Sequence, residues 1–241
     1  MQAFSENATV VLVHGAWADG SSWRNVVLPL QKEGLNVVCA PLPLTSLSAD
    51  VAALRRVLAR SEGPLLLVGH AYAGAVIGMM NLAQVKGLVY VAALAPDEGE
   101  SVGQVFFRDE PHADAPQLAP DTDGFIWMPE SGFAKAFAQN AAIDEMKIAA
   151  AVQRPIAVKC IEEPASAPAW KTKPSWYLIA EEDRMINPKT QRFMAERMGA
   201  TIIVHDVDHT PSLTAPEVVI DLVRTAARET LANSVDSIHA K

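Results

Sequence analysis

Short runs of apolar and β-branched residues alternate along the chain with segments in which apolar residues recur every three or four positions. The runs cover residues 9–13, 35–40, 65–68, 85–94, 175–180 and 201–207. The first run is continuously apolar, which predicts a strand covered on both faces, as in a parallel sheet, and the other runs are read as strands of the same sheet. The intervening segments have the period of amphipathic helices.

Capping signals support these helices. Asn187 followed by Pro188 predicts a helix start, because asparagine caps and proline suits the first helical position. Ser48 is expected to cap an earlier helix. Thr214 and Glu217 have the spacing of a capping box before the last helix. Alternating strands and helices predict an α/β fold: a mostly parallel twisted sheet with helices on both faces.

The amino-acid composition of the chain changes between about 97 and 172. This segment holds seven of the sixteen prolines and many of the aromatic residues, but no long apolar run. It is too long for a simple connection between strands, so we expect an inserted cap, with helical pieces at 131–140 and 143–153. The whole chain, 1–241, is predicted to form one α/β domain carrying this cap.

The sharpest turn is expected at residues 69–74, Gly-His-Ala-Tyr-Ala-Gly, between a buried strand and a helix. Small residues at 69, 73 and 74 suit a chain that reverses next to its neighbours. The pattern matches the strand–turn–helix motif Gly-x-Ser-x-Gly, whose apex residue is a nucleophile. In this chain the apex is Ala71, which carries no nucleophilic group.

Three further strand ends carry unusual residues, and in such sheets functional sites lie at the carboxyl ends of strands. They are His-Gly-Ala-Trp at 14–17, Glu-Glu-Asp-Arg at 181–184 and Asp-His-Thr-Pro at 208–211. The order apex, acid, histidine is that of the α/β-hydrolases. The chain resembles that fold over essentially its whole length, and in particular the small esterase-like branch that contains plant methylesterases and hydroxynitrile lyases.

The resemblance implies a role for each residue. His209 would be the general base, and Asp183 would orient it, with Glu182 as the alternative acid. The backbone N–H groups of Ala16 and Tyr72 would form an oxyanion hole. We expect the substrate to be a small, mostly apolar ester or carbonyl compound.

Ala71 departs from the family pattern. Loss of a triad nucleophile costs roughly a million-fold in turnover, so hydrolysis is expected to be impaired in the chain as it stands. A serine replaced on purpose and a native alanine both explain Ala71, and both explanations stay open here. With a native alanine, the chain is either a non-hydrolytic enzyme (a lyase, an isomerase or a cofactor-free oxygenase) that uses a His–Asp dyad, or a ligand-binding pseudoenzyme.

Aromatic and histidine side chains near these motifs complete the predicted site. Trp17 is a candidate pocket residue, and so are Phe125 and Trp127, which flank a proline turn in the cap. His14 and His70 are interpreted as structural residues.

The remaining signals narrow the class of protein. The net charge is -8, with 28 acidic and 20 basic residues, so nucleic acid and anionic membranes are not expected partners. Residues 1–6 lack a signal peptide's basic region, and no apolar run reaches membrane-span length. Cys39 and Cys160 are interpreted as reduced thiols of a cytoplasmic protein. Asp206 and Asp208 are interpreted as solvent-facing residues.

No cofactor is predicted, and no pair of His, Cys or Asp has metal-ligand spacing on one element. The expected partner is therefore a small-molecule substrate or ligand. A homodimer is common for this architecture, and the sequence leaves the oligomeric state open.

Overall fold

The structure, a computed structural model, describes residues 3–233. Within them, six strands form one sheet in the order β2-β1-β3-β4-β7-β8, and every pairing is parallel. The strands are β1 (Thr9–Val13), β2 (Asn36–Ala40), β3 (Leu65–His70), β4 (Val85–Val91), β7 (Ser175–Ala180) and β8 (Thr201–His205). The predicted parallel sheet is confirmed, although β4 and β8 end earlier than the apolar pattern indicated.

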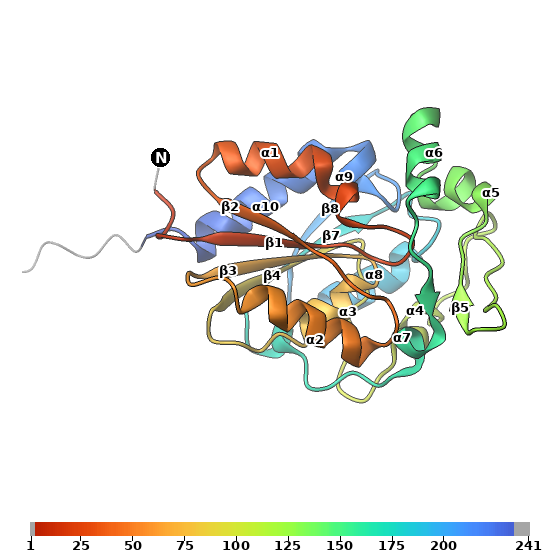
Figure 1. Ribbon diagram of the computed structural model, residues 1–241, viewed down its shortest axis with the longest axis horizontal. Helices are drawn as coiled ribbons and strands as arrows, with labels where there is room; N and C mark the ends of the chain where they lie inside the picture. The colour runs from red at the N-terminus through yellow and green to blue at the C-terminus, as the bar shows by residue number, and fades with distance from the viewer. Residues whose placement is uncertain (1–2, 234–241) are drawn as a thin grey trace, which may run out of the picture.

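Helices flank the sheet on both sides (Figure 1). They are α1 (Arg24–Lys32), α2 (Leu47–Leu58), α3 (Ala73–Gly78), α8 (Pro188–Arg197), α9 (Pro211–Thr214) and α10 (Pro216–Thr230). A 3₁₀ turn, η1 (Gly20–Trp23), precedes α1. This arrangement is the α/β architecture expected from the alternating pattern.

Successive residues of each strand face opposite sides of the sheet and enter two different cores. Val10 and Leu12 of β1 pack with α1 and α10, on one side of the sheet. Val11 and Val13 pack with α2, α3 and α8, on the other side. All four side chains are fully buried, which explains why the strand is apolar at every position instead of alternating.

The helix starts follow the capping signals in part. Asn187 accepts a hydrogen bond from the Lys189 N–H (2.9 Å) and caps α8 as predicted. The prediction for Ser48 is wrong. Ser46 is the cap of α2, and its hydroxyl accepts a hydrogen bond from the Ala49 N–H (3.0 Å). Several hydroxyl residues lie side by side here, and sequence alone does not say which one adopts the extended cap conformation.

The predicted capping box before α10 is also wrong. The residue at the cap position is Ala215, and no side chain caps this helix. The hydroxyl of Thr214 instead donates a hydrogen bond to the Asp208 carboxylate (2.6 Å). A buried carboxylate from the preceding loop therefore competes for the hydroxyl that the capping box would use.

The segment between β4 and β7 crosses the carboxyl ends of the strands, at the end of the molecule opposite the N-terminus (Figure 1). Its elements are α4 (Val102–Phe106), β5 (Phe125–Ile126), α5 (Glu130–Gly132), a π-helical turn η2 (Phe133–Phe137), α6 (Ile143–Ala151), β6 (Ile156–Ala157), α7 (Val158–Glu162) and η3 (Ala169–Lys171). The helix expected at 131–140 is therefore divided into α5 and η2. The other expected helix, 143–153, corresponds to α6.

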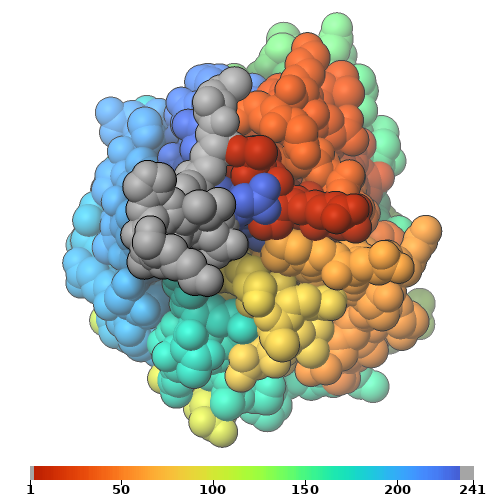
Figure 2. Space-filling view, turned by 90° about the vertical axis from the view of Figure 1, so that its left-hand side faces the viewer, coloured from red at the N-terminus to blue at the C-terminus, as the bar shows by residue number. Residues whose placement is uncertain are grey.

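Figure 2 shows the other end of the molecule, where the start and the end of the described chain lie side by side. Phe4 forms an antiparallel bridge with Ala232 there. The cap thus covers one end of the sheet and the two termini meet at the other. Residues that follow the strands lie beneath the cap.

Candidate active site

The turn after β3 has the geometry of a nucleophile elbow. Ala71 lies at its apex in a left-handed conformation, with φ of +50°. A side chain at Gly69 would place its Cβ 2.9 Å from the Ala73 carbonyl oxygen, and one at Gly74 would come within 2.4 Å of the Leu94 carbonyl oxygen. These close approaches explain why glycine is needed on both sides of the apex.

The histidine and the acid predicted from the sequence meet beneath the cap. The Nδ1–H of His209 donates to the Asp183 Oδ2 at 2.8 Å, and both side chains are buried. The same Oδ2 accepts the Gln191 Nε2–H (2.8 Å), and Oδ1 accepts the N–H groups of Met185 (2.7 Å) and Ile186 (2.9 Å). Four donors thus converge on Asp183, an arrangement that suits an ionised carboxylate.

Glu182, the alternative acid, points elsewhere. Its side chain is exposed, and its carboxylate accepts a hydrogen bond from the Asn140 Nδ2–H at 2.9 Å. The structure therefore brings Asp183, and not Glu182, to His209.

The second ring nitrogen of His209, Nε2, forms no hydrogen bond within the described residues, 3–233. In the neutral ring with its proton on Nδ1, where Asp183 accepts it, Nε2 carries the lone pair that can accept a proton. His209 lines an apolar cavity beneath the cap.

Two backbone N–H groups are also open at this place. The Trp17 N–H donates to the Arg154 carbonyl (3.0 Å) and the Ala71 N–H to the Val91 carbonyl (3.3 Å). The N–H groups of Ala16 and Tyr72 have no acceptor in the described part of the chain, and both residues line the same cavity. Two free amides next to a basic nitrogen can bind an oxygen on which negative charge develops.

The cavity has a volume of about 350 Å³. It lies between the elbow, the loop after β1 and the cap elements α4 and α7. Its lining is almost entirely apolar; the residues are Ala16, Trp17, Ala71, Tyr72, Leu94, Ser101, Val102, Gly103, Gln104, Phe106, Phe107, Leu118, Ile126, Ile156, Val158, Ile161, Glu162, Met185, Ile186 and His209. Such a chamber suits a small ligand with little polar surface.

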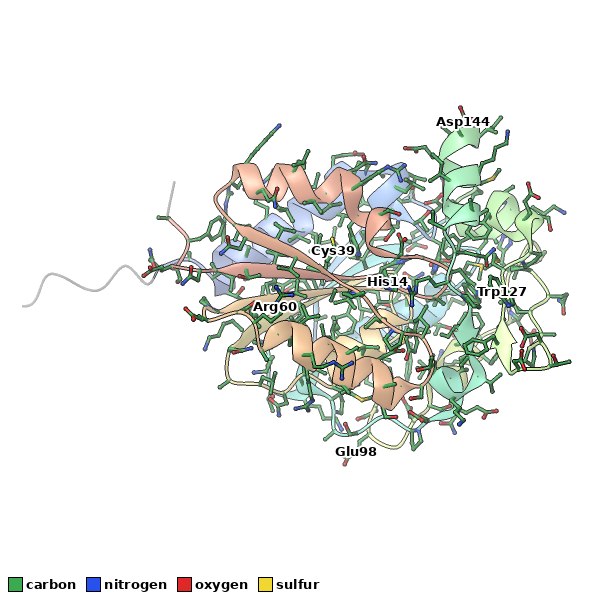
Figure 3. The ribbon with its side chains drawn as sticks, viewed as in Figure 1. His14, Cys39, Arg60, Glu98, Trp127 and Asp144 are labelled. Atoms are coloured by element: carbon green, nitrogen blue, oxygen red, sulfur yellow. The ribbon has the colours of Figure 1, made fainter. Side chains whose placement is uncertain are left out.

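Only one of the three predicted aromatic pocket residues lines this cavity. Trp17 does, and its indole N–H donates to the Ile126 carbonyl at 2.9 Å. Phe125 and Trp127 are not among its lining residues. Phe125 is half-buried and packs against the core on this side of the sheet, and the Trp127 indole N–H donates to the Asp121 carboxylate at 3.2 Å. Trp127 is 52% exposed, and Figure 3 shows it on the cap, away from His14.

His14 and His70 are buried and serve the surrounding loops. The Leu42 N–H donates to the Nε2 of His14 (3.0 Å), and the His14 Nδ1–H donates to the Gly15 carbonyl (2.9 Å). The His70 Nε2–H donates to the carbonyl of His209 (2.6 Å). Burial lowers the pKa of His14, and burial next to His209 lowers the pKa of His70 to about 3. Both imidazoles are therefore neutral, and they hold the neighbouring loops in place through hydrogen bonds to backbone groups.

Asp208 was expected to face solvent, and this prediction is wrong, whereas Asp206 is exposed as expected. The Asp208 side chain is fully buried. It accepts hydrogen bonds from the Thr210 N–H (3.1 Å), the Thr214 hydroxyl (2.6 Å) and the Asn140 N–H (3.0 Å). Burial raises the pKa of Asp208. The residue fixes the loop that carries His209 and joins it to the cap.

A second buried acid that the sequence analysis missed supports the elbow. Asp50 of α2 accepts the Tyr72 hydroxyl (2.7 Å) and the Leu44 N–H (2.7 Å). The Cys160 thiol of α7 is 3.6 Å from the same carboxylate. A polar residue on an otherwise apolar helix face was the one signal for this role, because a buried carboxylate needs partners.

Among residues 3–233, no group of three or more His, Cys, Asp or Glu side chains is arranged to hold a metal ion. No helix in that range combines the length and the apolar character that a membrane crossing requires.

Comparisons with known proteins agree with this geometry. A family model described as the Alpha/beta hydrolase family matches residues 10–222. Alpha/beta hydrolase nvfD of Aspergillus novofumigatus (strain IBT 16806) is 27% identical, covering 92% of this chain and 97% of that protein.

Solved structures show the same fold. The pyrethroid hydrolase PytH with BIF superposes with a TM-score of 0.80 and 21% identity, covering 92% of this chain and 98% of that one. Polyneuridine aldehyde esterase superposes with a TM-score of 0.79 and 17% identity, covering 91% of this chain and 99% of that one. The elbow, the His–Asp pair and these comparisons lead to one conclusion: the chain belongs to the alpha/beta hydrolase family.

Proposed function

We propose that this protein has an esterase-type site for a small, mostly apolar ester or related carbonyl compound, and that hydrolysis is impaired by the alanine at position 71. One observation carries the proposal. His209, held by Asp183, lines the same apolar cavity as the methyl group of Ala71 and the two residues with free amides, Ala16 and Tyr72. A base, an orienting acid and two amide donors are the groups that an acyl-transfer site needs besides its nucleophile, and this supports the proposal.

The lining of the cavity supports this substrate class. Glu162 is the one charged residue in the lining apart from the titratable His209, and its side chain is exposed, at the edge of the cavity. No lysine or arginine lines the cavity that could pair with a carboxylate or phosphate. An uncharged ligand avoids the cost of desolvating a charge without a partner.

The names of the structural neighbours point in the same direction. One is described as a pyrethroid hydrolase and another as an aldehyde esterase. Their identity to this chain is low, so they support the reaction class and leave the substrate to be found by assay.

The mechanism of such a site follows from its geometry. With a hydroxyl at position 71, His209 Nε2 would remove the hydroxyl proton as oxygen attacks the carbonyl carbon. Asp183 would stabilise the resulting imidazolium. The amides of Ala16 and Tyr72 would bind the oxyanion. The Ala71 methyl has no electron pair to donate, so the acyl-enzyme cannot form.

The test is Ala71→Ser, assayed with p-nitrophenyl acetate and butyrate. We expect hydrolysis at least about a thousand-fold above that of the parent chain, since loss of a triad serine costs roughly a million-fold. The double variant Ala71→Ser, His209→Ala is the matched control and should lose this gain. A folded Ala71→Ser protein that hydrolyses neither ester would count against an esterase-type site.

A second candidate is a non-hydrolytic enzyme that uses His209 as a general base. It is favoured by a specific observation: Asp183 is held by four donors and orients a histidine whose Nε2 has no partner in the described residues. Such a buried, oriented base is costly to maintain if the cavity only binds a ligand.

A further inference from the structure

We propose that the chain with Ala71 catalyses proton transfer at the carbon next to the carbonyl group of an uncharged, apolar ketone. His209 Nε2 takes the proton, and the amides of Ala16 and Tyr72 hold the enolate oxygen. The proposal rests on the second candidate function and names its substrate class and its reaction.

The base is suited to a carbon acid. Its Nδ1–H is bonded to Asp183 at 2.8 Å, so Nε2 carries the lone pair that accepts the proton. His70 donates to the carbonyl of His209 at 2.6 Å and so fixes the backbone of the base. Because burial next to His209 lowers the pKa of His70 to about 3, His70 stays neutral and does not compete for the proton.

Two backbone N–H groups can stabilise the negative charge that develops on the substrate. Removing a proton next to a carbonyl moves charge onto the carbonyl oxygen. The N–H groups of Ala16 and Tyr72 have no other acceptor in residues 3–233 and meet at the cavity wall. They can strengthen their hydrogen bonds as the enolate forms, which lowers the barrier in a cavity of low polarity.

The mostly apolar lining favours a C–H group over a water molecule as the proton donor. Once a carbonyl oxygen occupies the two amides, a water on His209 Nε2 would have few polar side chains around it, since Glu162 is exposed at the edge of the cavity, although a buried water needs two to four partners. Ser101 and Gln104, also in the lining, bond each other in the capping box of α4. A C–H group needs no further polar contact.

The reaction balances without a co-reactant. The C–H bond breaks and its electron pair forms a carbon–carbon double bond. The carbonyl π pair moves to oxygen, and the proton forms an N–H bond with His209. Asp183 stabilises the imidazolium. Return of the proton to the same carbon gives exchange with solvent, and return elsewhere gives an isomer. Nothing is oxidised or reduced.

The experiment measures deuterium uptake by ¹H NMR in D₂O with acetophenone, propiophenone and α-tetralone. We expect the parent chain to exchange the protons next to the carbonyl of at least one ketone about a hundred-fold faster than the same concentration of free imidazole, since general-base catalysis contributes about 10²–10⁴. His209→Ala should fall to the imidazole rate. Asp183→Asn should lose at least about ten-fold, since the tautomer is no longer enforced.

His112→Ala is the matched control. His112 is exposed and pairs with Asp114, away from the cavity, so this variant should exchange at the parent rate. Folding of each variant is checked by its melting temperature. The proposal is overturned if the folded parent chain exchanges none of the three ketones faster than imidazole, or if His209→Ala retains the parent rate.

The two proposals fail separately. Ester hydrolysis by Ala71→Ser, without ketone exchange by the parent chain, overturns the proton-transfer proposal and leaves the esterase-type site supported. Ketone exchange by the parent chain, without a gain in ester hydrolysis from Ala71→Ser, supports the proton-transfer proposal and overturns the esterase-type site. If neither is seen, the cavity is a binding site, and both proposals are wrong.

Discussion

The buried contact between Tyr72 and Asp50 makes the most quantitative prediction. Tyr72 follows the apex of the elbow, is 3% exposed, and donates its hydroxyl to the Asp50 carboxylate at 2.7 Å. The carboxylate is fully buried. Tyr72→Phe removes this donor and leaves the Leu44 N–H and the distant Cys160 thiol as the remaining partners.

The cost follows from the charge of the acceptor. A hydrogen bond to a charged group contributes about 1.5–3 kcal/mol. A loss of about 2 kcal/mol lowers the melting temperature of a chain of this size by about 4–8 °C. The buried hydroxyl is replaced by hydrogen with no change in the rest of the ring, so cavity formation adds little.

The loss should also depend on pH. Burial raises the pKa of Asp50 above its ordinary value of 3.8, while the Tyr72 hydrogen bond opposes that rise. The stability that protonated Asp50 contributes is therefore full below pH 3.8 and is lost as pH rises through the raised pKa. Without the Tyr72 hydroxyl the pKa rises further. The stability difference between parent and variant should then grow as pH rises from the raised pKa of Asp50 in the parent to its still higher pKa in the variant.

Thermal unfolding at several pH values checks this prediction, with Tyr90→Phe as the matched control. Tyr90 is also a fully buried tyrosine, but its hydroxyl has no hydrogen-bond partner in the described residues. Its removal should leave the melting temperature unchanged or raise it. Equal melting temperatures for Tyr72→Phe and Tyr90→Phe, or a difference that shrinks as pH rises, would refute the reasoning.

Two other predictions concern Gly74 in the elbow and Gln191 in α8. Gly74→Ala should destabilise the fold by about 3 kcal/mol, because its Cβ would lie 2.4 Å from the Leu94 carbonyl oxygen. Gly78→Ala is the control and should leave the stability nearly unchanged, because its Cβ would be 3.4 Å from its nearest neighbour. Equal melting temperatures for the two variants would contradict the prediction. Gln191→Leu removes a donor from Asp183 and leaves two backbone groups unpaired, so its melting temperature should fall by about 6–12 °C. A fall of less than 2 °C, on the order of a surface change, would be the contrary result.

Local patterns predicted the sheet well because its strands are short and buried on both faces. The apolar run at 175–180 coincides with β7 residue for residue. The Asn187 cap was also predictable, since the asparagine and the proline after it act on their own helix. In both cases the signal lies in consecutive residues of the chain and does not depend on which distant segment packs against them.

The errors lie where a distant partner decides the conformation. Thr214 has the spacing of a capping box, but its hydroxyl bonds Asp208 instead. Asp208 alternates with an apolar residue as a surface residue would, yet the Asn140 N–H from the cap reaches it and allows its burial. Hydrogen bonds between such distant residues depend on how the cap folds over the sheet, and the residues next to Asp208 in the sequence carry no information about that.

The candidate site was predictable in part for the same reason. The order of motifs along the chain identified His209 and Asp183, because strand ends of a parallel sheet meet at one edge. It did not identify Gln191 or Asp50, which reach the site from helix interiors. It also could not say that Ile126, between Phe125 and Trp127, is the residue of this segment that lines the cavity, because that depends on how the cap folds back over the sheet.

The cap is joined by hydrogen bonds to the three loops that follow β1, β7 and β8 at the site. Backbone or side-chain groups at 135–140 bond Glu182, Arg184, Asp208 and Thr210. Trp17, in the loop after β1, bonds the cap at Ile126 and Arg154. These contacts make the cap and the catalytic loops one cooperative unit, in which local unfolding of one part raises the free energy of the other. Without its cap, the protein would lose the placement of its histidine and its acid as well as the wall of its cavity.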